Sequence, residues 1–403
     1  MIASNDKQVP YWRLSSFYFF YFALLGGLVP YWSLYLQSLN FSAIDIGYLM
    51  SILMVTKMIA PNVWGWLADH HVNRVKIIRL GSLLAVVAFL GLFIDTSFWW
   101  IALVMFAFGF FRNAVLPQFE VITLSFLGDR PHWYSRVRLW GSIGFILAVA
   151  LIGAWLDYAS IDHLPHMLLV LGILIWISSL SVSATKQEQK KTSNGQFLQT
   201  LKRKEVVAFF VVCLLMQLGH GPYYTFFSPY LDSYGYSGTA IGLLWALGVL
   251  MEVIVFWYMH KLLPKFGPRN ILLFSLVLAV IRWWLIGRFP ENVPMLLIAQ
   301  CMHAATFGCF HAVAIELVRQ FFCSTDQGKG QALYSSASFG AGGAIGAVLS
   351  GYAWESLGSY NTYLLASLVS LIALVITWVW MRPGVNGGKV DSSKVDSNTA
   401  VNN

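Results

Sequence analysis

The chain alternates long apolar runs with short polar connections, and this pattern predicts membrane-spanning helices. A hydrocarbon core about 30 Å thick needs roughly 20 apolar residues, because an α-helix rises about 1.5 Å per residue. Twelve runs meet this requirement, so we expect an all-α integral membrane protein with twelve transmembrane helices. They are Ser15–Leu36, Ile44–Ala68, Val75–Ile94, Phe98–Leu127, Val137–Leu156, Pro165–Ser183, Val206–Leu231, Ala240–Leu263, Asn270–Arg288, Pro294–Phe322, Ala332–Trp354 and Tyr360–Met381.

A polar stretch divides these runs into two sets of six. Residues 185–205, TKQEQKKTSNGQFLQTLKRKE, form the longest polar segment before the C-terminal region. We therefore predict an N-terminal six-helix bundle at 1–184, a cytoplasmic linker at 185–205 and a C-terminal six-helix bundle at 206–382. Residues 383–403, rich in Ser, Asn, Asp and Gly, are predicted to be a disordered cytoplasmic tail. The basic cluster at 202–204 is either part of a solvated loop or a site for anionic lipid.

Composition and charge agree with a multi-pass membrane protein. The chain has 403 residues, of which 58% are hydrophobic and only 11% charged, with a net charge of +8. With both termini in the cytoplasm, every Lys and Arg outside the apolar runs except Arg288 falls on the cytoplasmic side, as the positive-inside rule requires. Topology therefore explains the basic charge, and nucleic acid is not needed as a partner. The first run is too long for a signal peptide, so we expect it to be retained.

The two halves of the chain repeat each other's features at a spacing of six helices. The loop that begins at Gly65 and continues through Asp69 to Arg74 has a weaker counterpart at Lys265–Arg269. Small residues let membrane helices approach closely, and paired irregularities in two halves are typical of repeat-built transporters. The fifth run carries Gly141, Gly144 and Gly153, and the eleventh carries Gly340, Gly342, Gly343, Gly346 and Gly351.

Three ionisable residues stand near the middle of separate apolar runs: Glu252, Arg282 and His303. A charge at membrane depth costs roughly 2.5–3.5 kcal/mol on insertion scales, so it persists where it is paired or faces a wet cavity. Burial favours a neutral Glu252, whereas a nearby Arg282 favours its carboxylate, so the group could switch between the two forms. We interpret the three residues as a proton-coupling site. A static ion pair between Glu252 and Arg282 is the structural alternative.

The N-terminal half contains a second set of charges within apolar runs, namely Lys57, Arg112 and Glu120. Lys57 and Arg112 lie too far from the ends of their runs to reach the interface. They could attract a carboxylate from a substrate, or pair with Glu120 between helices. We place all three among the candidate substrate-binding residues.

Three further residues complete the candidate substrate site: Arg138, His220 and His311. Arg138 lies early in the fifth run, near the cytoplasmic face. The alternative to a substrate-binding role is that it follows the positive-inside rule as a basic anchor at that face. His220 stands in a Gly- and Pro-containing stretch that either frees backbone carbonyls to line a cavity or simply kinks the helix. His303 and His311 are eight residues apart and share roughly one helix face, and a histidine there could relay a proton or bind substrate.

Other classes of function find little support in the sequence. The chain has no HExxH, GxSxG or phosphate-binding loop motif, and its four cysteines and nine histidines lack zinc spacing. We therefore expect no enzyme activity, no metal site and no cofactor. A receptor or scaffold would leave the mid-membrane charges unexplained.

The segment Gly65-x-Leu67-Ala68-Asp69, followed by Arg74, resembles the signature loop of the major facilitator superfamily. In that reading Gly65 permits a close helix contact. Asp69 and Arg74 form a latch at the cytoplasmic face, either with each other or with a neighbouring helix end, and so favour one access state. The resemblance implies two pseudo-symmetric six-helix bundles that transport by alternating access.

Within that superfamily the chain is similar to the phenylpropionate permease branch, a relative of the lactose and nucleoside proton symporters. The similarity rests on segments 136–145, 244–256, 280–283 and 300–311. It implies proton-driven uptake of a small organic substrate across a bacterial inner membrane. The lactose permease pattern has an acid in helix eight, an arginine in helix nine, and a histidine plus a carboxylate in helix ten.

Glu252, Arg282 and His303 match the first three positions of that pattern, and Thr306 replaces the second carboxylate. The coupling arrangement is therefore expected to differ. The buried cations favour an aromatic carboxylate such as 3-phenylpropionate as the substrate, carried by a monomer with protons. An oligosaccharide or nucleoside symporter is the alternative, and an efflux antiporter is disfavoured because the glycine pattern Gly141-Ser-Ile-Gly144 lacks a proline.

Overall fold

The fold is helical throughout the part of the chain that can be described. The structure, a computed structural model, describes residues 9–70, 73–128, 130, 132–183 and 197–381. Within these residues helices are joined by short connections and no β-strand occurs, so the predicted all-α fold is confirmed. Residues 185–196 of the predicted linker and the whole predicted tail lie outside the described residues.

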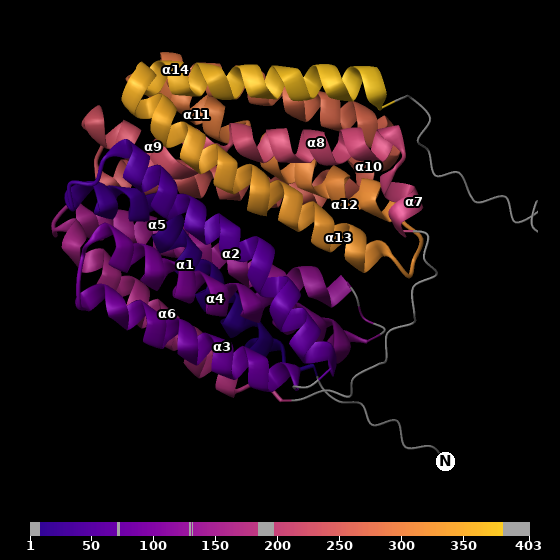
Figure 1. The fold of residues 1–403 in the computed structure, drawn as a ribbon, viewed down its shortest axis with the longest axis horizontal. Helices are drawn as coiled ribbons and strands as arrows, with labels where there is room; N and C mark the ends of the chain where they lie inside the picture. The colour runs from indigo at the N-terminus through magenta and orange to yellow at the C-terminus, as the bar shows by residue number, and fades with distance from the viewer. Residues whose placement is uncertain (1–8, 71–72, 129, 131, 184–196, 382–403) are drawn as a thin grey trace, which may run out of the picture.

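The N-terminal bundle, residues 9–183, consists of six long helices drawn in indigo to magenta in Figure 1. Helix α1 packs against α5 and α6, and α4 packs against α2 and α3. The helices are α1 (Tyr11–Ser38), α2 (Ala43–His70), α3 (Arg74–Phe89) with its 3-10 extension η1 (Leu90–Phe93), α4 (Phe98–Leu127), α5 (His132–Leu156), and α6 (Leu164–Leu180) preceded by the 3-10 turn η2 (Ile161–His163).

The C-terminal bundle, residues 197–381, is built from more interrupted helices. Two of its spans contain a π-helical stretch, a form that is rare and recurs at functional sites. The elements are α7 (Phe197–Leu201), α8 (Lys204–Gly219), α9 (Gly221–Ser233), α10 (Gly238–Arg288), α11 (Val293–Cys301), the π-helix η3 (Ala304–Cys309), α12 (Phe310–Phe321), α13 (Gln327–Ser335), the π-helix η4 (Ser336–Gly342) and α14 (Gly343–Trp380).

Within the described part of the chain, ten helical segments are long and apolar enough to cross a membrane. Two of them have 51 and 54 residues, which is about 80 Å of helix and far more than one crossing needs. Each is broken at a glycine with positive φ, Gly267 at 73° and Gly358 at 82°. Only glycine adopts this backbone region readily. The breaks lie between the eighth and ninth and between the eleventh and twelfth predicted spans.

The end of the predicted linker differs from the expectation. Residues Phe197–Leu201 form the short helix α7, and α8 begins at Lys204, before the predicted start of the bundle at 206. Glu205 lies in the first turn of α8, where a negative charge is favoured by the helix dipole. It forms an exposed ion pair with Arg203 at 3.8 Å, which fits the solvated-loop interpretation.

Small residues bring helices into backbone contact in both bundles, as the glycine pattern predicts. In the N-terminal bundle, a Cβ at Gly26 of α1 would lie 2.5 Å from the carbonyl oxygen of Phe145 in α5. In the C-terminal bundle, a Cβ at Gly342 would lie 2.5 Å from the carbonyl oxygen of Leu214 in α8. Real Cβ atoms do not approach so closely, so these contacts require glycine.

Gly65 does not make the close contact expected of it. A Cβ at this position of α2 would meet no atom within 4 Å. In this conformation the residue therefore faces open space, and its role in helix packing is not realised.

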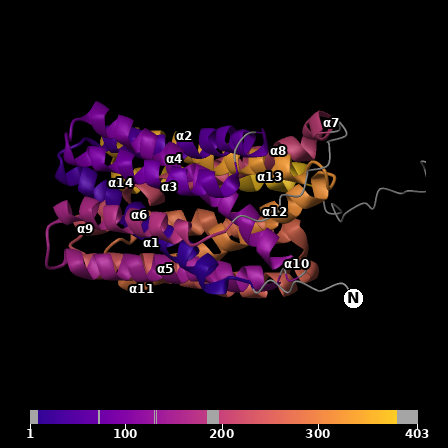
Figure 2. The same cartoon turned by 90° about the horizontal axis from the view of Figure 1, so that it is seen from below.

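The two bundles are joined at the end of the molecule away from the start of α1 (Figures 1 and 2). The backbone N–H of Ile44 donates to Glu355 at 3.2 Å, and the hydroxyls of Tyr48 and Tyr352 lie 2.8 Å apart. We call this the closed end. It also contains inter-bundle hydrogen bonds that pair Tyr31 with Gly238 and Thr239 with Asp157.

Candidate functional site

A cavity of about 520 Å³ lies between the two bundles. Its size is in the range of pockets that bind small organic molecules. The ionisable side chains on its wall come from both bundles, and seven of them are predicted site residues. They are Lys57, Arg112, Glu120 and Arg138 from the N-terminal bundle, and Glu252, His303 and His311 from the C-terminal bundle.

On the C-terminal wall, Glu252 of α10 faces His303, which lies between α11 and η3. The Glu252 Oε2 atom is 3.7 Å from Nε2 of His303. Glu252 keeps 19% of its side chain exposed, whereas His303 is 4% exposed. The carboxyl group is therefore the member of the pair that cavity water or a substrate can reach.

Arg282 lies behind this pair and does not reach the cavity. Its guanidinium donates to Nδ1 of His303 at 3.0 Å and to the hydroxyl of Thr306 at 2.9 Å. It is fully buried and pairs with no carboxylate in the described residues. The suggested ion pair between Glu252 and Arg282 is thus absent here, because His303 stands between the two groups.

Aromatic rings and a glutamine complete the pocket around the guanidinium. The Arg282 Cζ atom is 4.4 Å from the ring centre of Tyr223 and 4.6 Å from that of Trp283. Such cation–π contacts are strongest where water is excluded. Gln300 accepts from the Tyr223 hydroxyl at 3.0 Å and from Arg282 at 3.5 Å.

Sequence reasoning missed Tyr223, Gln300 and Thr306 as site residues. Gln300 and Thr306 each lie three residues from His303 and are polar residues in an apolar run. That spacing places them on the same side of a helix as the histidine. Their spacing from His303 could therefore have identified Gln300 and Thr306 as site residues. Tyr223 is one of many aromatic residues, and no pattern in the sequence distinguishes it.

On the N-terminal wall, Lys57 and Arg112 are cations without an ionic partner among the described residues. Among the described residues, the hydrogen-bond partner of the Lys57 ammonium is the thioether sulfur of Met54, at 3.4 Å. Arg112 is 5% exposed, and its Nε and one terminal nitrogen have no hydrogen-bond partner. The alternative in which these cations pair with Glu120 is not realised among the described residues.

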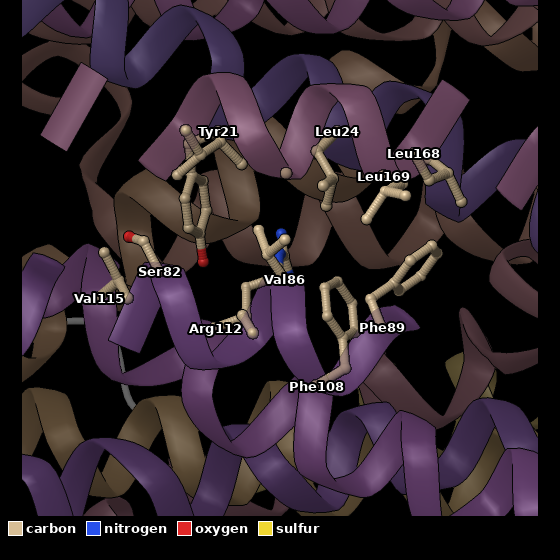
Figure 3. A pocket seen from close by; sticks show the side chains of 13 residues that line it. Tyr21, Leu24, Ser82, Val86, Phe89, Phe108, Arg112, Val115, Leu168 and Leu169 are labelled. Carbon is tan, nitrogen blue, oxygen red and sulfur yellow. The ribbon is translucent and has the colours of Figure 1, made fainter. Parts of the chain in front are cut away.

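Arg112 also borders a small internal cavity of about 20 Å³, which has room for about one water molecule. Figure 3 shows the arginine among Tyr21, Ser82, Val86 and Phe108 in the interior of the bundle. Its Cζ atom lies 4.7 Å from the ring centre of Tyr21. The rings of Tyr21 and Phe108 thus lie beside the guanidinium, but no carboxylate in the described residues neutralises its charge.

Glu120 and Arg138 lie on the cavity wall nearer the start of α5. Glu120 accepts from the hydroxyl of Tyr134 at 3.4 Å. Arg138 stacks on Phe22, with its Cζ atom 3.8 Å from the ring centre. Both predicted residues thus line the cavity, and Arg138 is more than an anchor at the membrane surface.

The two remaining histidines differ in position. His311 lines the cavity, and its Nδ1 atom lies 3.0 Å from the hydroxyl of Tyr334. His220 is fully buried outside the cavity wall, with Nδ1 2.7 Å from the carbonyl oxygen of Met216. His220 therefore does not line the cavity in this conformation, and its substrate-binding role stays a prediction. The break between α8 and α9 acts as a kink, since the His220 N–H still donates to Met216.

The predicted latch at the C-terminal end of α2, Asp69 with Arg74, does form an ion pair. Asp69 and Arg74 are 2.5 Å apart, and Arg74 also donates to Gln118 of α4. The pair joins the end of α2 to the start of α3 and so lies within one bundle. No group of three His, Cys, Asp or Glu residues in the described ranges is arranged to hold a metal ion.

Comparison with known proteins gives the family. Residues 11–365 match the MFS_1 like family. A probable 3-phenylpropionic acid transporter of Escherichia coli (strain K12) is 31% identical over 388 residues, covering 91% of this chain and 96% of that protein. The maltose permease of Geobacillus stearothermophilus is 23% identical and covers 89% of this chain and 92% of its own length.

Solved structures give the same fold. A structure of the nucleoside transporter NupG superimposes with a TM-score of 0.81 at 16% identity, covering 93% of this chain and 99% of that chain. The chain, with its two helical bundles around a charged cavity, therefore belongs to the MFS_1 like family of the major facilitator superfamily and is a membrane transporter.

Proposed function

We propose that the protein takes up a small aromatic carboxylate, such as 3-phenylpropionate, together with protons. The observation that carries the proposal is the pair of unpartnered cations, Lys57 and Arg112, on one wall of the cavity. Lys57 is half-buried and Arg112 is buried, and neither has a carboxylate among the described residues, so a bound anion would stabilise both cations. The 31% identical relative is described as a transporter of such an acid.

The opposite wall supports binding of the rest of the substrate. Tyr224, Trp245 and Phe307 line the cavity beside Glu252. Aromatic side chains favour offset or edge contacts with another ring, each worth about 0.5–1.5 kcal/mol beyond the area they bury. An aromatic acid would place its carboxylate on the N-terminal wall and its ring on the C-terminal wall.

Glu252 is the proposed carrier of the proton. It is the carboxyl group of the C-terminal wall, and its neighbour His303 separates it from the permanent charge of Arg282. Loss and gain of a proton at a carboxyl inside the membrane changes the cost of exposing it to either side. Coupling would follow if only the protonated or substrate-bound protein changes its access state.

The closed end would then face the periplasm. The positive-inside distribution of Lys and Arg places the linker and the Asp69–Arg74 pair in the cytoplasm. The lining of the cavity extends to Tyr134, in the first turn of α5 on that side. We therefore assign this conformation to the inward-facing state of a monomeric inner-membrane protein with cytoplasmic termini.

Uptake of labelled 3-phenylpropionate into energised membrane vesicles tests the proposal. We expect accumulation in the parent that is lost on addition of a protonophore and in Glu252→Gln. Glu291→Gln, at an exposed position outside the cavity, is the matched control and should transport normally. Parent uptake no greater than that of vesicles without the protein would reject the aromatic acid.

A sugar or nucleoside symporter remains the second candidate, because relatives with those activities share the whole fold. In that case the charges on the wall would bind hydroxyl groups. Uptake of three labelled compounds separates the two: 3-phenylpropionate, maltose and uridine are offered in turn. Uptake of the acid alone supports the leading proposal, whereas uptake of maltose or uridine alone supports the alternative.

A further inference from the structure

The three groups Glu252, His303 and Arg282 form a line from the cavity into the interior of the C-terminal bundle. Arg282 lies at the buried end, with its guanidinium 3.0 Å from Nδ1 of His303. Glu252 lies at the cavity end, 3.7 Å from Nε2 of the same ring. Each ring nitrogen of the histidine therefore has a different neighbour.

The neighbour on the Nδ1 side decides where the proton of the ring is placed. An arginine side chain has five N–H donors and no acceptor, and it stays charged in proteins. A neutral histidine has one N–H and one acceptor nitrogen. Since the guanidinium can only donate, Nδ1 must be the acceptor, and the proton must be on Nε2, which faces Glu252.

Arg282 is itself held in place and cannot easily turn away. Its guanidinium lies over the Tyr223 and Trp283 rings, and Thr306 and Gln300 accept further hydrogen bonds from it. These contacts fix both the position and the direction of the donor that meets Nδ1.

Addition of a second proton to His303 would be unfavourable at this site. A protonated Nδ1 would direct an N–H at the N–H of a buried cation, with no water to separate them, because Arg282 is fully buried. The charged or titratable groups on the elements around His303, apart from Arg282, are Glu252 (α10), Tyr223 and Tyr224 (α9), His220 (the α8–α9 junction), His311 (α12), Arg138 (α5), Lys57 (α2), and Arg112 and Glu120 (α4). Glu252 alone among these is in ion-pair contact with the ring.

We infer that Arg282 is a positioning residue that holds His303 neutral with its proton on Nε2, and that His303 directs this N–H at Glu252, 3.7 Å away, without carrying a transported proton. The inference rests on the proposed proton coupling. It assigns the gain and loss of the transported proton to Glu252 alone. It departs from the expectation that His303 relays a proton. The histidine instead stabilises the Glu252 carboxylate and separates it from the guanidinium.

The tautomer can be measured without any substrate. Purified protein labelled with 15N in its nine histidines gives ring signals by NMR, and the signals lost in His303→Gln identify those of His303. We expect one protonated Nε2 and one unprotonated Nδ1 from about pH 5 to about pH 9, although a free histidine would gain a proton in this range. A protonated Nδ1 at any pH in this range would overturn the inference.

Two amide substitutions test the role of the donor in transport. The amide nitrogen of Gln can occupy the place of Nε2, whereas that of Asn lies near the place of Nδ1, and neither side chain titrates. His303→Gln should keep proton-dependent uptake within about threefold of the parent, with the same pH profile. His303→Asn should lose roughly tenfold or more, because it removes the N–H donor that faces the Glu252 carboxylate.

A pH profile that changes in His303→Gln would show that the ring itself titrates, and would overturn the inference. Arg282→Lys provides a second readout, because its ammonium lacks the fixed planar fork of the guanidinium. We expect NMR of this variant to show a mixture of His303 tautomers; a single Nε2-protonated form would contradict the positioning role. If the parent takes up no 3-phenylpropionate, the proposed function fails, while the NMR result still decides the tautomer.

Discussion

Asp157 caps the N-terminus of a helix in the opposite bundle. It follows the last residue of α5, and its carboxylate accepts from the backbone N–H of Thr239 at 3.2 Å and from the Thr239 hydroxyl at 2.5 Å. Thr239 lies in the first turn of α10. Glu355 of α14 makes the equivalent contact with the N–H of Ile44 in α2. The N-terminus of a helix attracts negative charge, so the two carboxylates connect the bundles at related positions.

The Asp157 contact predicts a shift in the balance of access states. Asp157→Asn removes the charge at the start of α10 and should weaken the closed end by about 0.5–2 kcal/mol, the usual value of a helix cap. The population open at this end should rise several-fold. Spin labels placed on the two bundles at the closed end would report this change as a longer distance.

A matched control for this prediction is Asp95→Asn. Asp95 lies at the same end, but its carboxylate bonds to Ser97 of its own loop. It should leave the distance distribution unchanged. Equal distributions in the parent and Asp157→Asn would mean that the cap does not hold the bundles together.

Arg112 predicts a charge-selective loss of substrate binding. Arg112→Gln should raise the half-saturation concentration for 3-phenylpropionate about 10- to 100-fold, because a hydrogen bond to a charged group contributes about 1.5–3 kcal/mol. Competition by the uncharged 3-phenylpropanamide should be little affected. The two constants are measured by uptake at increasing substrate or competitor concentration.

The comparison for this prediction is Arg288→Gln, which changes an exposed arginine outside the cavity. It should behave as the parent does. An equal loss of acid and amide binding in Arg112→Gln would indicate that the arginine supports the bundle rather than the carboxylate.

The glycine contacts predict a difference in stability between two alanine substitutions. Gly26→Ala would place a Cβ 2.5 Å from a backbone oxygen of Phe145, which cannot move aside without shifting α5. Overpacking of this kind costs about 1–3 kcal/mol. Gly172→Ala would place its Cβ 3.4 Å from a side-chain atom of Val86, an ordinary contact. Thermal unfolding in detergent should therefore show a lower midpoint for Gly26→Ala only; equal midpoints would argue against a tight α1–α5 contact.

Much of the fold could be predicted from apolar run length alone, since a bilayer imposes one helix length on every span. The position of Glu252, Arg282 and His303 could be predicted because charges at membrane depth need partners. The spatial order of these three side chains could not be predicted, since it depends on how α10 and η3 rotate against each other. The contact between Asp157 and Thr239 could not be predicted from the sequence either. Acidic and hydroxyl residues are common near helix ends, and the two are 82 positions apart.

The Asp69–Arg74 pair predicts a large effect on transport with a small effect on stability. The Asp69 side chain is 38% exposed, and ion pairs of that kind contribute about 0–1 kcal/mol. Asp69→Asn should therefore unfold at nearly the parent temperature, yet change the uptake rate several-fold if the pair selects an access state. Glu205→Gln breaks an ion pair with a similarly exposed acid and should alter neither quantity. A normal uptake rate in Asp69→Asn would limit the pair to a local structural role.

A substitution at Gly65 should affect the two access states differently. Its Cβ position is empty in this conformation, and alanine is favoured over glycine in a helix by about 1 kcal/mol. Gly65→Ala should therefore stabilise the conformation described here. If Gly65 becomes a close helix contact when the cavity opens to the other side, the same substitution should slow uptake. We expect a raised unfolding midpoint together with slower transport, and parent-like transport would mean that neither state needs glycine at this position.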